Sequence, residues 1–145
     1  MRRTSGHELD ATSLYALLKL RAEVFIAEQQ SPWLDVDGRD LDPSTVHLWL
    51  PGDDGDGAVA TVRVTAECDG VARIGRVCAA PSHRGRGLIG VLMTAALAEL
   101  DGRACLLEAQ SHLEAMYAMY GFAREGDEFI EDGIPHVPMR RPAGV

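Results

Sequence analysis

One glycine-rich stretch decides the predicted fold: Arg84-Gly85-Arg86-Gly87-Leu88-Ile89-Gly90. It follows an apolar run over residues 71–79 that predicts a strand, and it opens an apolar helical pattern over residues 88–100. A helix N-terminus carries about half a positive charge and several unpaired amide N–H groups, so glycines here let phosphate oxygens approach closely. The two arginines add charge-assisted hydrogen bonds. The stretch therefore predicts a phosphate site between a strand and a helix.

The patterns on either side of this stretch indicate a mixed α/β fold. A first helix is expected from about residue 14 to residue 28, capped by Thr12 or Ser13, and a long ordered loop is expected over residues 29–45. Further strands are predicted over residues 46–50, 58–66 and 104–109, with a third helix over 111–120 and a C-terminal hairpin around Asp132-Gly133. This order favours an α/β (α+β) fold with a mostly antiparallel central sheet and helices on both faces.

Composition and charge narrow the functional classes. The chain has 145 residues, 46% of them hydrophobic, and a net charge of −8, which predicts one domain over residues 1–145 and disfavours nucleic-acid partners. Three cysteines without a C-x-x-C pair suggest neither a disulfide framework nor a structural zinc site. No apolar run approaches the roughly 18 residues of a membrane helix, and no signal sequence is indicated. We therefore expect a cytoplasmic protein that binds no membrane.

The glycines also match another nucleotide-binding pattern. Gly85-x-Gly87-x-x-Gly90 fits the dinucleotide fingerprint, and Glu108 lies near the distance expected for its ribose-binding acid. However, residues 81–84 separate the strand from the first glycine, and the chain after Glu108 is too short for the remaining strands of a doubly wound domain. A fragment of a dinucleotide-binding oxidoreductase stays the alternative.

The stretch resembles the pyrophosphate loop of the GNAT superfamily of acyl-CoA N-acyltransferases, which reads Arg/Gln-x-x-Gly-x-Gly/Ala. Arg84 to Leu88 fit that pattern, whereas the sixth position is Ile89 and the glycine comes one residue later, at Gly90. Further similarity lies in Gln110, in Tyr117 seven residues on, and in the Gly121-Phe122 pair. Residues 20–29, Asp37-Gly38, His47 and residues 131–136 look like the ElaA-type subfamily.

This resemblance implies an N-acetyltransferase that carries an acetyl group from acetyl-CoA to a primary amine of a small molecule, by direct attack in a ternary complex and without a metal. The implied coenzyme-binding residues are Val77, Cys78 and Ala79, whose backbone would pair with the pantetheine arm, together with Arg84, Gly85, Arg86, Gly87, Leu88, Ile89, Gly90 and Gln110. Tyr117 matches the general acid that returns a proton to the thiolate. The same tyrosine also belongs to an apolar helical stripe with Leu113, Met116 and Tyr120, a pattern typical of a core.

The acceptor side is less determined by the sequence. Glu28 and His136 are predicted to line the substrate pocket, and the general base is left open between Glu28, Glu108, His112, His136 and a water molecule. The acids of residues 35–40 superficially resemble a calcium loop, but their spacing favours a turn with Asx contacts. A regulatory module that binds acyl-CoA without turnover, a modifier of protein amines and a homodimer all stay open.

Overall fold

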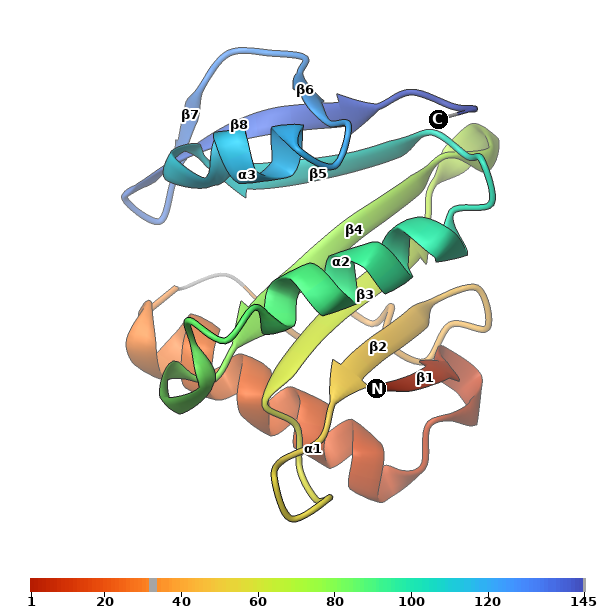
Figure 1. Cartoon of the computed structure of the whole chain (residues 1–145), viewed down its shortest axis with the longest axis vertical. Coiled ribbons are helices and arrows are strands. Elements are labelled where there is room, and N and C mark those ends of the chain that lie inside the picture. Colours follow the sequence, from red (N-terminus) through yellow and green to blue (C-terminus); the bar gives the residue numbers. More distant parts are fainter. Residues whose placement is uncertain (32–33, 145) are drawn as a thin grey trace.

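A computed structural model of the chain describes residues 1–31 and 34–144. In these residues, eight strands form one sheet in the order β1-β2-β3-β4-β5-β8-β6, with β7 paired to β8 (Figure 1). Only β4 and β5 pair in parallel; every other described pairing is antiparallel. In chain order the strands are Arg2–Ser5, Val46–Leu50, Ala60–Ala66, Ala72–Ala79, Cys105–Gln110, Ala123–Arg124, Phe129–Glu131 and Ile134–Arg141.

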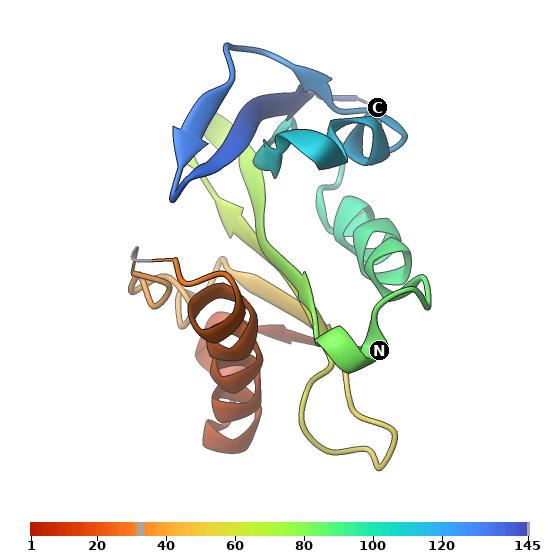
Figure 2. The same ribbon diagram turned by 90° about the vertical axis from the view of Figure 1, so that its left-hand side faces the viewer.

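Helices cover both faces of this sheet. The helix α1 (Ala11–Arg21) and the π-helical segment η2 (Ala22–Glu28) lie on one side, and α2 (Leu88–Glu99) and α3 (Glu114–Ala118) lie on the other (Figure 2). The predicted class, a mostly antiparallel sheet with helices on both faces, is thus confirmed. No helix in residues 1–31 and 34–144 has the length and apolar character needed to cross a bilayer.

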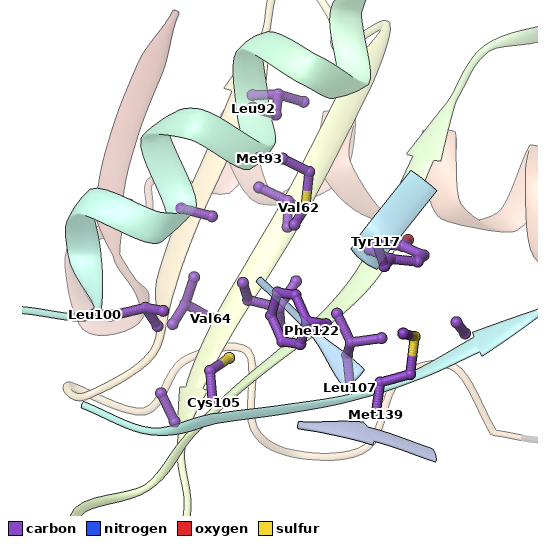
Figure 3. Packing of buried hydrophobic residues seen from close by; sticks show 14 of the residues in the cluster. Val62, Val64, Leu92, Met93, Leu100, Cys105, Leu107, Tyr117, Phe122 and Met139 are labelled. Atoms are coloured by element: carbon purple, nitrogen blue, oxygen red, sulfur yellow. The ribbon is translucent and has the colours of Figure 1, made fainter. Parts of the chain in front are cut away.

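The strand β3 is buried on both of its faces. Its residues Ala60, Val62 and Val64 belong to the main core, which they share with Leu92 and Met93 of α2 (Figure 3). Because side chains alternate along a strand, the polar residues of β3 point to the α1 side, where they are buried as well. These buried polar residues are Thr61, Arg63 and Thr65.

Several predicted boundaries were wrong, each for a local reason. The first helix begins earlier, because Asp10 is its cap: the Ser13 N–H donates to Asp10 Oδ1 at 2.7 Å. Its last part widens into a π-helix, which the periodicity of apolar residues does not reveal. The third helix is only five residues long, because a 3₁₀ turn takes Ser111–Leu113. The edge strand β1 was not predicted, since its polar residues carry no alternating apolar signal.

Candidate active site

The strands β4 and β5 run side by side for only two residue pairs and then separate. Ala72 pairs with Cys105 and Arg73 with Leu106, and beyond these pairs the strands diverge (Figure 1). Between the diverging strands lies a cavity of about 260 Å³ that is lined from both sides of the sheet. Its walls come from η2 and the residues after it, from β4 and β5, from the start of the α3 region and from the β7–β8 hairpin: Phe25, Gln29, Ser31, Arg73, Ile74, Gly75, Arg76, Val77, Leu107, Glu108, Gln110, Leu113, Tyr117, Glu131, Asp132, Ile134 and His136.

A β-bulge in β4 turns backbone groups toward this cavity. Gly75 lies opposite Arg63 and Cys78 lies opposite Thr61, so that Arg76 and Val77 together oppose a single residue of β3. Arg76 adopts a positive φ of 54°. The Ala80 N–H donates to the carbonyl oxygen of Val59, the residue before β3, at 2.8 Å, and Cys78 pairs with Thr61. Because hydrogen bonding alternates along a strand, the N–H of Val77 therefore points away from β3, toward the separated edge. The bulge, Arg76–Val77, therefore leaves an amide donor free beside the cavity.

The cavity brings together some of the predicted site residues and leaves others outside. Val77, Gln110, Tyr117 and His136 all line it. Glu28, predicted as a pocket residue, does not, whereas the next residue, Gln29, does. Cys78 points to the α1 side, where it packs in the second core, with Leu20, Val24 and Phe25.

Tyr117 is held at the margin of the main core (Figure 3). Its ring packs edge-to-face against Phe122, with the ring centroids 6.4 Å apart. Burial, with a smaller contribution from nearby Tyr120, raises the pKa of Tyr117 to about 12. Within the described part of the chain its hydroxyl group has no hydrogen-bond partner. Tyr117 is thus protonated at neutral pH, lines the cavity and is free to donate its proton.

Residues 84–90, which we call the phosphate loop, lead into α2. Gly85 and Gly87 both have positive φ angles, 78° and 75°, and Gly87 is the cap of the helix, with no side chain bonded to its first turn. Val91 N–H donates to Gly87 O at 3.3 Å, so the amides of residues 88–90 precede the first helical bond. Leu88 and Ile89 pack against the core, and Gly90 lies next to the hydroxyl of Tyr120.

One family of known proteins matches the part of the chain that forms the bulge, the cavity and the phosphate loop. The family described as acetyltransferase (GNAT) domain matches residues 22–142. The chain belongs to this GNAT acetyltransferase family. The match covers the bulge, the cavity walls and the phosphate loop together, and it confirms the resemblance stated on sequence motifs.

The GNAT chain has similar relatives along nearly its whole length. A UPF0039 protein of Mycobacterium tuberculosis is 50% identical over 145 residues, which cover 98% of this chain and 92% of the relative. Protein ElaA of Escherichia coli is 36% identical over 140 residues, 92% of this chain and 90% of ElaA. The crystal structure of an acyl-CoA N-acyltransferase from Pseudomonas aeruginosa has a TM-score of 0.89 at 38% identity, with 97% of each chain covered. The crystal structure of E. coli ElaA has the same TM-score at 34% identity and the same coverage.

These findings decide between the two readings of the glycines. The ElaA-type resemblance is confirmed, and nothing supports the dinucleotide-binding oxidoreductase. A doubly wound domain needs a largely parallel sheet, whereas β4 and β5 are the one parallel pair in the described residues of this GNAT chain.

On the β7–β8 side of the GNAT cavity, the orientation of His136 is determined by its neighbours. Its ring stacks on Phe129 at 5.7 Å between centroids, and its Nδ1 lies 2.8 Å from the carbonyl oxygen of Ile134. A carbonyl can only accept, so Nδ1 carries the hydrogen and donates it. In the neutral ring the lone pair is therefore on Nε2, which lies 4.0 Å from Glu131 Oε2.

Two predicted site residues bind each other. The guanidinium of Arg84 forms two hydrogen bonds with the carboxylate of Glu28, both 2.6 Å long, and its Nε donates to Ala79 O at 3.1 Å. The pair therefore links the end of η2 to the phosphate loop. Arg86, in contrast, has no carboxylate partner in the described part of the chain and only a long hydrogen bond to Ser82 O. Of the two arginines, Arg86 has its charge available.

Sequence reasoning missed a cluster of ion pairs behind β4, on the α1 side, which is buried except for the exposed Asp37 and the half-buried Arg76. It consists of three arginines and three aspartates, which we call the Arg–Asp network: Arg21, Asp35, Asp37, Asp40, Arg63 and Arg76. Arg21 is only 1% exposed. The acids that resembled a calcium loop thus bind guanidinium groups, and Asp37 Oδ1 also accepts the Arg39 N–H in an Asx contact. The available signal was Arg63, an arginine in the middle of a predicted strand whose neighbours are apolar.

Pairing with arginines changes the pKa values of carboxyl groups in this network. Burial alone raises the pKa of a carboxyl group, but hydrogen bonds and charges from Arg63 and its neighbours outweigh burial at Asp37 and hold its pKa well below the ordinary value. Asp40 follows the same pattern through Arg21 and Arg63, so its pKa is lowered too. Burial lowers the pKa of His47, whose Nε2 donates to Asp40 O at 2.8 Å. Three carboxylates therefore face three guanidinium groups, and the adjoining histidine is neutral.

Proposed function

We propose that the chain is an N-acetyltransferase that transfers the acetyl group of acetyl-CoA to the primary amine of a small molecule, by direct attack in a ternary complex. The single observation that carries this proposal is the cavity between β4 and β5. Val77, the protonated Tyr117 and His136 all line this one cavity. Amide formation from a thioester requires a donor to the carbonyl oxygen, an acid and a base.

The phosphate loop suits the diphosphate of coenzyme A. The amides of residues 88–90 lack helical partners, Gly85 and Gly87 keep side chains away from them, and Arg86 adds a free charge. Acetyl-CoA supplies an activated acetyl group when bound. From this loop the backbone of residues 77–79 leads along β4 toward the cavity, which supports the predicted contact with the pantetheine arm. By the same alternation the backbone of Cys78 faces β3, whereas that of Ala79 faces the open side, where its carbonyl oxygen accepts from Arg84 Nε and keeps a second lone pair. We therefore assign the pantetheine contacts to Val77 and Ala79.

The roles of the side chains follow from their protonation. Tyr117 holds a proton that it can return to the departing thiolate, because its pKa is about 12. His136 offers Nε2 to the incoming amine as a proton acceptor. Glu108, Glu131 and Asp132 lie around it in the wall of the cavity, which favours an amine acceptor that is a cation in water.

Direct transfer is favoured over an acyl-enzyme because no activated thiol faces the cavity. Burial raises the pKa of Cys78 to about 12 and that of Cys105 to about 11, so both stay protonated. Neither of them lines the cavity, and Cys68 is exposed elsewhere. The three free thiols also support a cytoplasmic location. The proposal assigns the activity to one domain, residues 1–145, and the homodimer stays a prediction.

A thiol-release screen tests the proposed function. Purified protein is mixed with acetyl-CoA and a panel of diamines, amino acids, aminoglycosides and lysine peptides, and free coenzyme thiol is measured. We expect release with at least one small cationic amine and none with the peptides. Release with peptides alone would instead identify a modifier of protein amines.

Thermal shift measurements separate the remaining alternatives. Acetyl-CoA at about 100 times its Kd should add about 2.7 kcal/mol to the free energy of unfolding, whereas NAD should add nothing. Stabilisation by acetyl-CoA without thiol release from any amine would favour the regulatory module, and stabilisation by NAD alone would contradict the proposed function.

A further inference from the structure

The proposed chemistry makes no direct use of the Arg–Asp network, of which four members are buried: Arg21, Asp35, Asp40 and Arg63. The Arg–Asp network draws its members from α1, from the loop after η2, from β3 and from β4, and it lies directly behind the bulge. Its connection to the site is Arg76, which belongs both to the network and to the cavity wall.

The side chain of Arg76 is fastened to the loop after η2 by several contacts. Its Nε lies 2.9 Å from Asp35 Oδ1, and its Nη2 donates to Asp35 O at 3.0 Å and to Asp37 Oδ2 at 3.3 Å. The two acids are fixed in turn by the other arginines. Arg21 Nε donates to Asp35 Oδ2 at 2.9 Å, and Arg63 binds both oxygens of Asp37 at 2.9 and 2.7 Å.

The backbone conformation of Arg76 depends on these side-chain contacts. Its φ of 54° lies in the left-handed region, which a residue with a Cβ adopts only when its surroundings hold it there. In bulges whose first residue is left-handed, this position is typically glycine, which adopts the conformation freely. Here an arginine occupies it, and the next residue is Val77, whose N–H faces the cavity. If Arg76 returned to an extended conformation, the strand would lose its extra residue and the N–H of Val77 would rotate.

We infer that Arg76, held by Asp35 and Asp37, is a positioning residue that keeps the β4 bulge in the conformation in which the Val77 amide faces the reacting carbonyl. This inference rests on the proposed function for its catalytic consequence, but not for its structural part. The Arg–Asp network thus acts on catalysis through the backbone of Arg76 and touches no reacting atom.

Two substitutions at position 76 separate conformation from charge. Arg76→Ala removes the fastening and keeps a Cβ, so we expect kcat to fall at least tenfold while the Kd of acetyl-CoA changes less than threefold. Arg76→Gly also removes the guanidinium but adopts the left-handed conformation freely, so kcat should stay within threefold of wild type. If Arg76→Ala does not fold, Arg76→Gly decides alone. A tenfold or greater loss in Arg76→Gly, or wild-type kcat in Arg76→Ala, would overturn the inference.

A double-mutant cycle tests whether Asp37 acts through Arg76. With Arg76 present, Asp37→Asn should lower kcat about fivefold, because the fastening loosens. In the Arg76→Gly background the same change should lower kcat less than twofold. Equal losses in both backgrounds would contradict the coupling. Arg3→Gln, which breaks an exposed ion pair with Glu99 on the far edge of the sheet, controls for loss of a surface guanidinium and should leave kcat unchanged.

An activity-independent measurement keeps this inference separate from the proposed function. In ¹⁵N-resolved NMR spectra without ligand, the Val77 amide resonance of Arg76→Gly should stay near its wild-type position, whereas that of Arg76→Ala should move. Unmoved Val77 resonances in a folded Arg76→Ala protein would overturn the inference. If the NMR result is as expected but no amine is acetylated by the wild type, the proposed function fails and the positioning role of Arg76 in the bulge stands.

Discussion

The two sides of β4 are built in opposite ways. On the α2 side, the phosphate loop is seven consecutive residues that present backbone amides and open space. On the α1 side, the Arg–Asp network joins residues as far apart as Arg21 and Arg76 through buried side chains. The loop would bind its ligand with groups that every residue has, whereas the network depends on the identity of each member.

This difference predicts that substitutions in the two regions impair different properties, ligand binding in one and stability in the other. A backbone donor survives most side-chain substitutions, so changes in the loop should weaken binding while the fold persists. When a buried charge loses its partner, the free-energy penalty for removing that charge from water is no longer compensated. Changes in the network should therefore lower stability more than they change binding.

The largest effect should come from the most buried arginine. Arg21→Met leaves Asp35 and Asp40 without a main partner, so we expect the free energy of unfolding to fall by about 3–5 kcal/mol, measured by urea denaturation. The control is Lys19→Met in the same helix, which removes an exposed pair with Glu23 and should leave the denaturation midpoint unchanged. Equal losses in the two variants would contradict a special role for burial.

The next largest effect should be a loss of stability of the Arg–Asp network at low pH. The folded-state pKa values of Asp37 and Asp40 lie below the unfolded value of 3.8, so the stability they contribute is complete above that pH and is lost as the pH falls further. Each contributes a slope of up to about 1.4 kcal/mol per pH unit. We expect the unfolding free energy of Asp37→Asn to depend less steeply on pH below 4 than that of wild type. The exposed Asp127→Asn should keep the wild-type slope.

Between the two regions lies the acid of the proposed reaction. Tyr117→Phe removes the hydroxyl but keeps the ring against Phe122, so kcat should fall more than tenfold while the Kd of acetyl-CoA stays nearly constant. Tyr120→Phe, three residues on, should change kcat less than threefold. Full turnover of Tyr117→Phe in the thiol-release assay would remove this tyrosine from the mechanism.

A smaller effect should separate binding from folding in the phosphate loop. Gly87→Ala places a Cβ in open space but at a φ of 75°, which costs about 1–2 kcal/mol. We expect the Kd of acetyl-CoA to rise about fivefold as the loop shifts. Gly102→Ala is the control: Gly102 also has a left-handed φ, 77°, and open space where a Cβ would lie, but it is in the turn after α2. It should lose similar stability with an unchanged Kd, and a rise in its Kd would contradict the assignment of binding to the loop.

The same contrast explains what could be predicted from the sequence. The phosphate loop, the strand before it and the helix after it are contiguous, so glycine spacing and apolar periodicity were enough to locate them. The fold class, a mostly antiparallel sheet with helices on both faces, followed from the order of strands and helices along the chain, but the order of the strands in the sheet was not predicted. The position of Tyr117 came from a motif, since its apolar stripe alone favoured the core, where its ring does pack.

The Arg–Asp network could not be predicted in this way. Its pairs span up to 41 residues, as between Asp35 and Arg76, and nothing local indicates which arginine binds which acid. The bulge was hidden for a related reason: an arginine at a left-handed position carries no glycine signal. The Glu28–Arg84 pair was missed because each residue was assigned separately, one to the acceptor and one to the coenzyme.

The Glu28–Arg84 pair should produce the smallest effect, and it tests whether binding by the phosphate loop depends on backbone groups alone. Glu28 and Arg84 are both about 40% exposed, with side-chain values of 38% and 44%, so breaking their contact should change stability by less than about 1 kcal/mol. If Arg84 serves the phosphate loop, Glu28→Gln frees its guanidinium and should lower the Kd of acetyl-CoA by up to threefold. Glu114→Gln breaks an equally close exposed pair, with Arg124, away from the loop, and should leave the Kd unchanged. A weaker affinity in Glu28→Gln alone would mean instead that the ion pair holds the loop in its binding conformation, so that the loop, like the Arg–Asp network, would depend on the identity of particular side chains.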